Sequence, residues 1–341
     1  MRNDDKHMNK TDKILVAGAA GMVGNALVRA LLARGFDNIL GTIHHKVPDF
    51  GPEAEGRVRL EPLDLMDQAV VRAFFERERP SRVFLAAARV GGIQANNTYP
   101  ADFIHANLAI QTNVIHSAYQ TGVQHLLFLG SSCIYPRECQ QPIRESYLLT
   151  GPLEPTNRPY AVAKIAGIEM CWAYNRQYGT RYLAVMPTNL YGPGDNYDLQ
   201  TSHVLPALIR KAHEAKVRGE RNFTVWGTGA PRREFLYSDD LADACLFLMS
   251  EIGKTAPLFN DHEPPLVNIG CGEDVTIAEL AGMVAEVVGF EGEIVFDESK
   301  PDGTPQKLLD VTRISGMGWR PGVTLPEGIG LVYGDYVGRF G

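Results

Sequence analysis

Short apolar runs alternate with longer stretches of helical spacing through the first half of the chain. The apolar runs are typical of buried strands, and the stretches between them have the periodicity of helices. The strands expected from this pattern are 13–17, 38–43, 57–61, 82–87, 126–129 and 182–186. The helices expected between them are 25–32, 68–79, 101–120 and 159–178. The alternation predicts an α/β fold with a doubly wound parallel (Rossmann) sheet, in which ligands bind at the carboxyl ends of the strands.

The regular alternation ends after Pro193, where the pattern becomes mixed. In chain order, the segments expected there are a polar loop at 194–200, a helix at 203–217, a short strand at 224–226, a helix at 239–250, a linker-like segment at 251–265, a helix at 277–288 and a strand at 294–296. We therefore expect a smaller, mixed α/β C-terminal part in addition to the parallel sheet.

The composition narrows the class of protein without identifying it. With 341 residues, the chain suits one large domain or two joined ones. The formal net charge of −7, from 33 basic and 40 acidic residues, argues against nucleic acid as the main partner, because that would call for a basic stripe. A local basic pocket for a phosphorylated ligand is compatible with this charge. No apolar run reaches the roughly 18 residues needed to cross a bilayer, so no membrane partner is expected.

The cysteines and the N-terminal segment both bear on the compartment. The five cysteines are an odd number, and no Cys-x-x-Cys motif or Cys/His cluster suggests a metal. Residues 1–12 are polar and lack the apolar core of a signal peptide. We therefore expect a cytoplasmic protein with reduced thiols and no bound metal, and a disordered tail over residues 1–11.

A glycine-rich turn directly follows the first expected strand. Glycine permits a tight turn and a close approach of the backbone to a diphosphate, which the N-terminus of the next helix attracts. The spacing is Gly-x-x-Gly-x-x-Gly, and alone it is a weak signal, because glycines between strand and helix are common. The residues expected to contact a dinucleotide here are Gly18, Ala19, Ala20, Gly21, Met22, Val23 and Gly24.

Tyr160 and Lys164 indicate the chemistry. Four positions apart on a helix, they share one face, and an ammonium group favours ionisation of a neighbouring phenol. Such a phenol can pass a proton to or from a carbonyl oxygen, which predicts carbonyl–alcohol redox chemistry beside a nicotinamide. The pattern Tyr-x-x-x-Lys also arises by chance on exposed helices. Its position downstream of the glycine turn and of Ser131 favours the functional interpretation.

These residues resemble the catalytic set of the extended short-chain dehydrogenase/reductase family. Longer strings resemble its members that epimerise and reduce GDP-4-keto-6-deoxymannose. The strings that carry this resemblance are 130–136, 154–157, 187–193, 202–204 and 300–305. The resemblance runs from about Lys13 to about Trp319. It implies a homodimer that binds a GDP-sugar and NADP(H), with two discontinuous domains. The cofactor domain would take 12–189 plus about 222–251, and the substrate domain about 190–221 plus 252–341.

The resemblance also implies roles for five residues. Tyr160 would protonate O4 as hydride arrives, Lys164 would lower the pKa of Tyr160 and bind the nicotinamide ribose, and Ser131 would hydrogen-bond the same oxygen. Cys133 would be the base and His203 the acid that epimerise the carbons beside the ketone. A thiolate and an imidazole suit those tasks near neutral pH. A buried structural cysteine and a surface histidine are the ordinary alternatives.

The remaining site residues are expected at strand ends and in the C-terminal part. Besides the glycine turn, those expected to bind the cofactor are His44, Lys46, Asp64, Leu65, Leu129, Gly130, Ser131, Ser132, Lys164, Pro187, Thr188, Asn189, Leu190 and His203. Those expected to bind the nucleotide sugar are Lys211, Trp226, Arg233, Asp302 and Lys307. Arginine suits diphosphate oxygens, whereas a tryptophan can stack on a base or simply fill the core.

The segment after the second strand favours NADP over NAD. NAD enzymes usually place Asp or Glu there, on the ribose 2′-hydroxyl. Here no acid occurs until Asp49, and the basic residues instead favour a 2′-phosphate. Bacterial members of the family often carry a basic residue inside the glycine turn, where this chain has Ala20. Lys46, with His44 or Arg89, is expected to replace that contact.

Three alternatives stay open from the sequence. One is a relative that acts on another GDP-4-keto sugar, such as an enzyme of GDP-L-colitose formation. A second is a bare 4-reductase, against which the presence of both Cys133 and His203 argues. The third is a non-catalytic nucleotide-binding module, which would typically lack the tyrosine or the lysine that this chain keeps.

Overall fold

A parallel sheet forms the larger part of the molecule. In the computed structural model, which describes residues 8–300 and 302–341, this sheet has seven strands in the order β11-β6-β5-β4-β1-β2-β3. The strands are β1 Ile14–Ala17, β2 Ile39–Ile43, β3 Val58–Pro62, β4 Arg82–Leu85, β5 His125–Leu129, β6 Arg181–Pro187 and β11 Leu266–Ile269. The strand order reverses direction between β1 and β4, which is where ligands bind in such sheets. The predicted doubly wound parallel sheet is confirmed.

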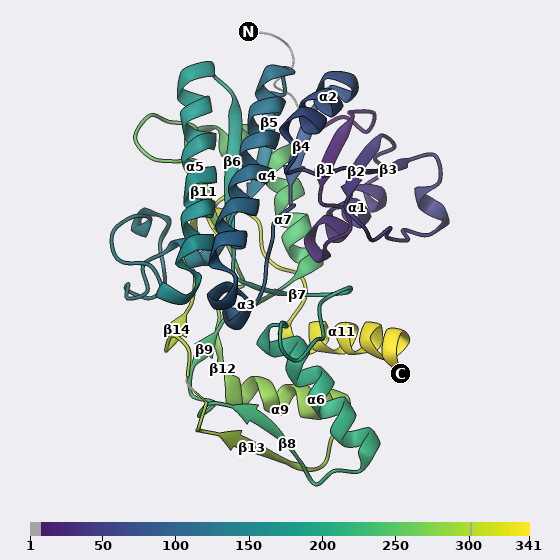
Figure 1. Ribbon diagram of the computed structural model, residues 1–341, viewed down its shortest axis with the longest axis vertical. Helices are drawn as coiled ribbons and strands as arrows, with labels where there is room; N and C mark the ends of the chain where they lie inside the picture. The colour runs from purple at the N-terminus through teal and green to yellow at the C-terminus, as the bar shows by residue number, and fades with distance from the viewer. Residues whose placement is uncertain (1–7, 301) are drawn as a thin grey trace.

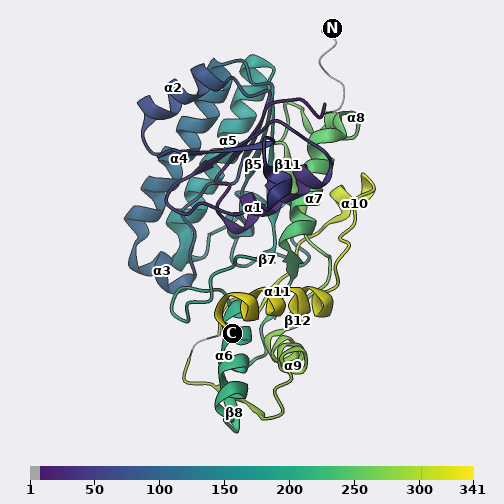
Figure 2. The ribbon, with the colours of Figure 1, turned by 90° about the vertical axis from the view of Figure 1, so that its right-hand side faces the viewer.

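Helices cover both faces of this sheet (Figure 2). They are α1 Met22–Ala33 and α7 Ser238–Ser250 on one face, and α2 Gln68–Glu78, α4 Pro100–Gln120 and α5 Arg158–Tyr178 on the other. Successive residues of β1 alternate between the two cores: Ile14 and Val16 pack toward α1, whereas Leu15 and Ala17 pack toward α2. This two-residue period is what a strand buried on both faces requires.

A smaller part lies below the sheet (Figure 1). It holds α6 Val204–Arg218, α9 Ile277–Val288 and α11 Leu325–Phe340, which share one apolar cluster with the paired strands β8 Asn222–Trp226 and β13 Glu293–Asp297. Three two-residue strands, β12 Val275–Thr276, β9 Arg232–Arg233 and β14 Gln306–Lys307, form a small sheet nearer the large one. The strands β7 Asn189–Tyr191 and β10 Phe235–Tyr237 pair with each other. The remaining short helices are α3 Ile93–Thr98, α8 Ile252–Thr255 and α10 Thr312–Gly316.

The domain limits expected from the sequence remain a proposal, which the strand pairings refine. The strand β8 pairs with β13 and packs on α6, so the segment from residue 222 belongs with the smaller part. The strand β11 pairs with β6, so the segment 266–269 belongs with the large sheet. We therefore propose that the chain returns to the larger part with α7, which packs against α1, and again at β11.

Two expectations about irregular segments differ from the structure, and one of them lies only partly within the described residues. The expected disordered tail extends over residues 1–11, of which 1–7 lie outside the described residues. Residues 8–11 are ordered: Met8 is buried, and the Lys10 carbonyl accepts a hydrogen bond of 3.1 Å from the Asp37 amide. The expected linker 251–265 contains α8 and a following 3-10 turn. No helix among the described residues is long and apolar enough to span a membrane.

Candidate active site

The glycine turn after β1 leaves no room for a side chain at Gly18 or at Gly24. Gly18 has φ +92°, and a Cβ there would lie 2.8 Å from the backbone of Ala87. A Cβ on Gly24 would clash with the carbonyl of Gly18. Gly21 begins α1 without a side-chain cap, and no acidic residue lies in the first turn. The helix N–H groups are therefore open to an anion, which fits the diphosphate of a dinucleotide.

The segment after β2 presents basic groups without a competing acid. His44, His45 and Lys46 are all exposed at the end of β2. Asp49, the first acid of the segment, accepts a hydrogen bond of 2.8 Å from the Gly51 amide and so stabilises its own loop. Arg89 is ion-paired with Asp102 at 3.1 Å. Lys46 and His44 are thus exposed basic groups with no acid among the neighbouring residues 44–48.

The structure brings Ser131, Tyr160 and Lys164 together. Ser131 follows β5, and Tyr160 and Lys164 lie in the first turns of α5. The buried Lys164 ammonium donates a hydrogen bond of 2.8 Å to the Leu129 carbonyl at the end of β5, and it lies 5.8 Å from the centre of the Tyr160 ring. Ser131 hydrogen-bonds with the Tyr160 side chain. Strand end and helix start therefore converge, as the doubly wound fold requires.

Burial controls the protonation of this group. Burial raises the pKa of Tyr160, with a smaller rise from Cys133 and an opposing contribution from the Ser131 hydrogen bond. Burial also lowers the pKa of Lys164 to about 8, and Cys133 opposes this shift. Desolvation of the phenolate is the largest cause of the raised pKa of Tyr160, and Lys164 is not among the groups that shift it, so the expected lowering by Lys164 stays a prediction. Tyr160 is a neutral phenol, which suits a proton donor.

Cys133 lies beside the same group with cations near it. The residue is 7% exposed and sits in a 3-10 turn, where its amide donates a hydrogen bond of 3.4 Å to the Ser131 hydroxyl oxygen. Burial raises the pKa of the thiol, while the nearby Lys307, the Ser131 hydrogen bond and Lys164 act in the opposite direction. Lys307 comes from β14, far away along the chain. Burial outweighs these effects, so the pKa of the thiol stays above that of a free cysteine, and the two lysines, from different parts of the molecule, offset part of the rise.

His203 stands at the start of α6, on the smaller part. It is the N-cap residue of that helix. Part of its side chain is open to solvent, and protein atoms surround the rest. This desolvation lowers the pKa of the imidazole, so the ring is neutral at pH 7. The loop before it contacts the turn that follows β4, because the Gly92 amide donates a hydrogen bond of 3.4 Å to the Thr201 carbonyl. This contact links His203 to the sheet.

Residues expected to bind the nucleotide sugar extend away from Cys133 along the smaller part. Arg233 on β9 is paired in register with Lys307 on β14. Burial lowers the pKa of both side chains, and Asp302 opposes the shift at Arg233. Partly buried cations next to each other form a place for a diphosphate. Asp302 accepts hydrogen bonds of 3.0 and 2.7 Å from the amide and hydroxyl of Thr228.

Trp226 ends β8 with its ring 57% exposed. The Lys211 ammonium lies 5.0 Å from the centre of this ring, and the Lys300 ammonium lies 5.7 Å from it. Lys211 also donates a hydrogen bond of 2.9 Å to the Thr224 carbonyl. An exposed tryptophan of this kind does not fill the core, so the core-packing alternative does not apply to Trp226. Lys300 is a neighbour that sequence reasoning missed, although it precedes Asp302 in the same string.

The expected cofactor residues after β6 are held in place by the backbone of Glu234. The Thr188 hydroxyl and the Asn189 amide donate hydrogen bonds of 3.1 and 2.8 Å to the Glu234 carbonyl. The Glu234 carboxylate is fully buried and accepts hydrogen bonds from the amides of Gly272 and Leu309. Sequence reasoning missed Glu234. Its signal was an acid in an otherwise apolar segment after two arginines.

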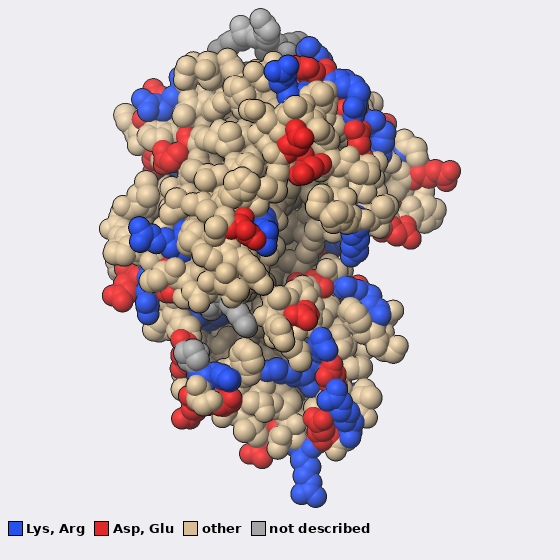
Figure 3. Space-filling model, in the orientation of Figure 1, with Lys and Arg blue, Asp and Glu red and all other residues tan. Residues whose placement is uncertain are grey.

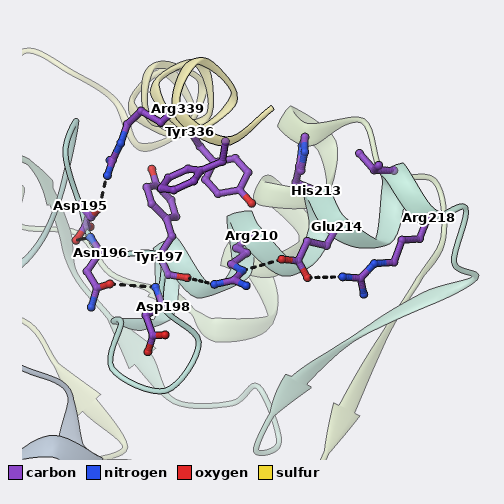
Figure 4. Close-up of a pocket in the computed structure, with 12 residues that line it drawn as sticks. Asp195, Asn196, Tyr197, Asp198, Arg210, His213, Glu214, Arg218, Tyr336 and Arg339 are labelled. Atoms are coloured by element: carbon purple, nitrogen blue, oxygen red, sulfur yellow. Dashed lines mark hydrogen bonds and ion pairs between the residues drawn. The ribbon is translucent and has the colours of Figure 1, made fainter.

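The space-filling view is hollowed between the large upper part and the smaller lower part (Figure 3). A separate groove of about 710 Å³ lies between α6, α11 and the loop that includes Asp195 and Tyr197 (Figure 4). Its arginines are already paired: Arg210 and Arg218 with Glu214, at 2.7 and 3.0 Å, and Arg339 with Asp335 at 3.2 Å. None of the residues expected to act in catalysis lines this groove. We therefore place the candidate active site between the two parts instead.

The parallel sheet, the open helix N-terminus and the Ser131–Tyr160–Lys164 group are features of dinucleotide-dependent enzymes. The chain belongs to the NAD dependent epimerase/dehydratase family, whose sequence model matches residues 14–270. GDP-L-fucose synthase 1 of Arabidopsis thaliana is 54% identical over 329 residues, which are 96% of this chain and 94% of that protein. GDP-L-fucose synthase of Escherichia coli (strain K12) is 51% identical over 323 residues, 94% of this chain and 95% of that protein.

A solved structure gives the same result for the fold. It is a GDP-mannoheptose C4 reductase from Campylobacter jejuni with NADP bound, with a TM-score of 0.82 at 37% identity. The match covers 97% of this chain and 99% of that one. The resemblance to epimerising and reducing members of the extended short-chain dehydrogenase/reductase family is thereby confirmed.

Proposed function

We propose that this protein is an NADP-dependent enzyme that converts GDP-4-keto-6-deoxy-D-mannose to GDP-L-fucose. It would invert C3 and C5 and then reduce C4. The observation that carries the proposal is the position of Cys133, a buried thiol beside the Ser131–Tyr160–Lys164 group with Lys307 near it. A plain reductase has no use for a thiol at this place. The names of the relatives support the same activity.

The reduction step uses the neutral phenol. NADPH, held by the glycine turn and Lys164, would supply the hydride at C4. Tyr160 then gives its phenolic proton to O4, so that the ketone becomes an alcohol and the tyrosine a phenolate that solvent reprotonates. Ser131 hydrogen-bonds the same oxygen, and the Lys164 ammonium stabilises the phenolate once it has formed.

The epimerisation step uses Cys133 and His203. The Cys133 thiolate removes the proton from the carbon next to the ketone, and the resulting enolate places its charge on O4 beside Ser131 and Tyr160. His203 returns a proton from the opposite face. Because burial keeps its ring neutral at pH 7, the ring must first take a proton from solvent, and Cys133 releases the abstracted proton to solvent, so no net proton is gained or lost. One site serves both inversions and the reduction because all three act around the same carbonyl.

The assignment of the other ligands follows from charge. We infer that the GDP diphosphate lies at Arg233 and Lys307, and that the guanine lies at Trp226 with Lys211 beside it. Lys46 and His44 would hold the 2′-phosphate of NADP. We also infer a cytoplasmic homodimer. The cytoplasmic location is supported by the five cysteines, which all lie in the described ranges and form no disulfide. The dimer is supported by the stacked rings of Tyr119 and Tyr178, whose centres lie 4.1 Å apart on α4 and α5.

The Lys46→Asp variant is expected to weaken NADPH binding at least about tenfold, which corresponds to 1.4 kcal/mol. The change replaces a cation beside the 2′-phosphate with an anion, while NADH lacks that phosphate and should bind nearly as before. The measurement is the affinity for both cofactors by fluorescence titration. Lys254→Asp, a like change on α8, is the control. Equal affinity of the unaltered enzyme for NADPH and NADH would contradict the assignment.

The pH profile of the reduction is expected to fall on its alkaline side above about pH 8. Lys164 is charged below its pKa of about 8 and loses its charge above it, and a neutral amine no longer stabilises the phenolate. The measurement is kcat/KM for NADPH, which reports the free enzyme. A Lys164→Arg variant should keep its charge and move the fall to higher pH. A profile that is flat through the alkaline range would exclude this role.

One experiment separates the alternative functions. The enzyme is incubated with NADPH and a panel of GDP-4-keto sugars, and the stereochemistry of each product is read by NMR. Inverted product from the 6-deoxymannose derivative supports the proposal. Preference for a sugar without O3 favours the colitose type, and uninverted product favours the bare reductase. Absence of NADPH oxidation with every sugar would leave the binding module as the better interpretation.

A further inference from the structure

A buried asparagine holds the turn that follows β4. Asn96 lies in α3 and is only 5% exposed. Its side-chain amide nitrogen donates hydrogen bonds of 2.7 Å to the Gly91 carbonyl and 3.1 Å to the Gly92 carbonyl. The Asn96 side-chain oxygen has no partner. The amide therefore acts through its two donors, and these fix the backbone of the Gly91–Gly92 turn.

The Gly91–Gly92 turn rests directly on the loop that ends at His203. The Gly92 amide donates to the Thr201 carbonyl at 3.4 Å, and a Cβ on Gly92 would lie 3.4 Å from the carbonyl oxygens of both Thr201 and Ser202. The buried Ser202 hydroxyl has no partner of its own. This side of the loop is thus placed by backbone contact with the turn.

The loop itself is stiff enough to transmit that placement. The Asp198 side chain accepts hydrogen bonds from the amides of Gln200 and Thr201, each at 3.0 Å, and from the Thr201 hydroxyl at 2.9 Å. The Ser202 amide donates to the Asp198 carbonyl at 2.8 Å. His203 follows at once as the N-cap of α6. A shift at Thr201 would therefore be carried to the imidazole.

On its other side, α3 contacts the segment that leads to Tyr160. It packs against the 3-10 turn Pro155–Asn157, which runs directly into α5. Figure 1 shows α3 at the lower ends of α4 and α5, toward the smaller part. The helix thus stands between the start of the tyrosine helix and the loop that carries the histidine. It touches both halves of the site without contributing a group to the chemistry.

We propose that Asn96 is a positioning residue that sets His203 opposite the Cys133 and Tyr160 group. The inference rests on the proposed function, in which His203 returns a proton and takes no part in the delivery of hydride. Loss of the Asn96 donors should therefore impair inversion and leave chemistry at C4 intact. Both donors of the Asn96 amide are used by the two carbonyls, so the proposed role of Asn96 is structural support of the turn.

The test compares Asn96→Asp with Asn97→Asp. The first change keeps the size of the side chain but removes both donors and faces two carbonyl oxygens with a carboxylate. The second makes the same chemical change at the exposed neighbour on the same helix. We expect Asn96→Asp to lower the rate of inversion about 100-fold, as misplacement by about 1 Å can do, and Asn97→Asp to leave it unchanged. Oxidation of GDP-L-fucose by NADP⁺, which needs C4 chemistry alone, should be retained in both variants.

A double substitution distinguishes positioning from general damage. If Asn96 acts through His203, then Asn96→Asp should add no further loss of inversion in a His203→Asn background. Losses that multiply, or equal behaviour of the Asn96 and Asn97 variants, would overturn the inference. The NMR signal of the His203 ring in the protein without substrate should shift in Asn96→Asp only. If the His203 signal does not move, the inference about Asn96 is wrong, whatever the substrate is. If the unaltered enzyme does not act on the keto sugar, only the proposed function is wrong.

Discussion

The Tyr160→Phe variant is expected to reduce the C4 ketone at least about 100-fold more slowly than the unaltered enzyme, the typical effect of losing a general acid. Burial raises the pKa of Tyr160, so the group that is lost is a protonated phenol. The change removes the hydroxyl and almost no volume. The edge-on contact of the ring with Phe103, at 6.3 Å between centres, should survive it. The effect is therefore expected in kcat rather than in folding.

The measurement is the oxidation of NADPH in the presence of the keto sugar, followed by absorbance. NADPH affinity, measured by fluorescence, should be retained, because Lys164 still donates to the Leu129 carbonyl. Tyr178→Phe, an exposed tyrosine at the other end of α5, is the matched control and should be neutral. Near-normal NADPH oxidation in Tyr160→Phe would remove this residue from its proposed role.

The sheet could be predicted because its strands are buried on both faces. Such strands are continuous apolar runs, and 13–17 and 82–87 match β1 and β4 almost to the residue. The helix α11 could not be predicted in the same way. Its sequence includes Gly328, Gly330, Gly334 and Gly338, which oppose helix formation. Packing explains at least Gly328, because a Cβ there would collide with the Tyr191 ring.

The exchange of segments between the two parts was predicted less well, because it depends on pairing rather than on local pattern. The sequence of β8 reads as a strand, but nothing in it shows that β13 is its partner. The two-residue strands β9 and β14 are too short for any periodicity, yet their register sets Lys307 beside Arg233. Strands of this length are defined by their partners alone.

The sequence indicated which residues would meet at the site, but it did not indicate their pKa values. Ser131 and Tyr160 meet because strand ends and helix starts share one edge of the sheet. The expected effect of Lys164 on Tyr160 assumed a solvated pair, whereas both are buried, and desolvation then dominates. The approach of Lys307 to Cys133 joins distant segments of the chain. No sequence motif indicated that these two residues would lie close together.

The Cys133→Ser variant is expected to lose the exchange of the C3 and C5 protons with solvent by at least about 100-fold, as expected for removal of a general base. Burial already raises the pKa of the thiol, and it is the nearby Lys307 and Lys164 that favour the thiolate. A hydroxyl of almost the same shape is far harder to ionise than a thiol. The base is lost while the packing is kept.

The reduction should survive in this variant in a diagnostic form. Tyr160 and hydride are still present, so Cys133→Ser should slowly reduce the uninverted ketone and give a 6-deoxy sugar of the original D series. Cys139→Ser is the matched control, because Cys139 is a second thiol under the influence of Lys307 but lies further along the chain. It should yield the inverted sugar at the normal rate.

The His203→Asn variant should lose inversion without losing proton exchange. The contrast with Cys133→Ser would show which residue acts on which face of the sugar. Abstraction by Cys133 is expected to persist, so protons exchange with solvent while inversion is impaired. The measurement is NMR of the sugar ring in D₂O, with and without NADPH. If Cys133→Ser still gives fully inverted L-sugar at the normal rate, the thiol is structural. The base must then be another group at the same edge of the sheet, since the enolate needs O4 to stay beside Ser131 and Tyr160.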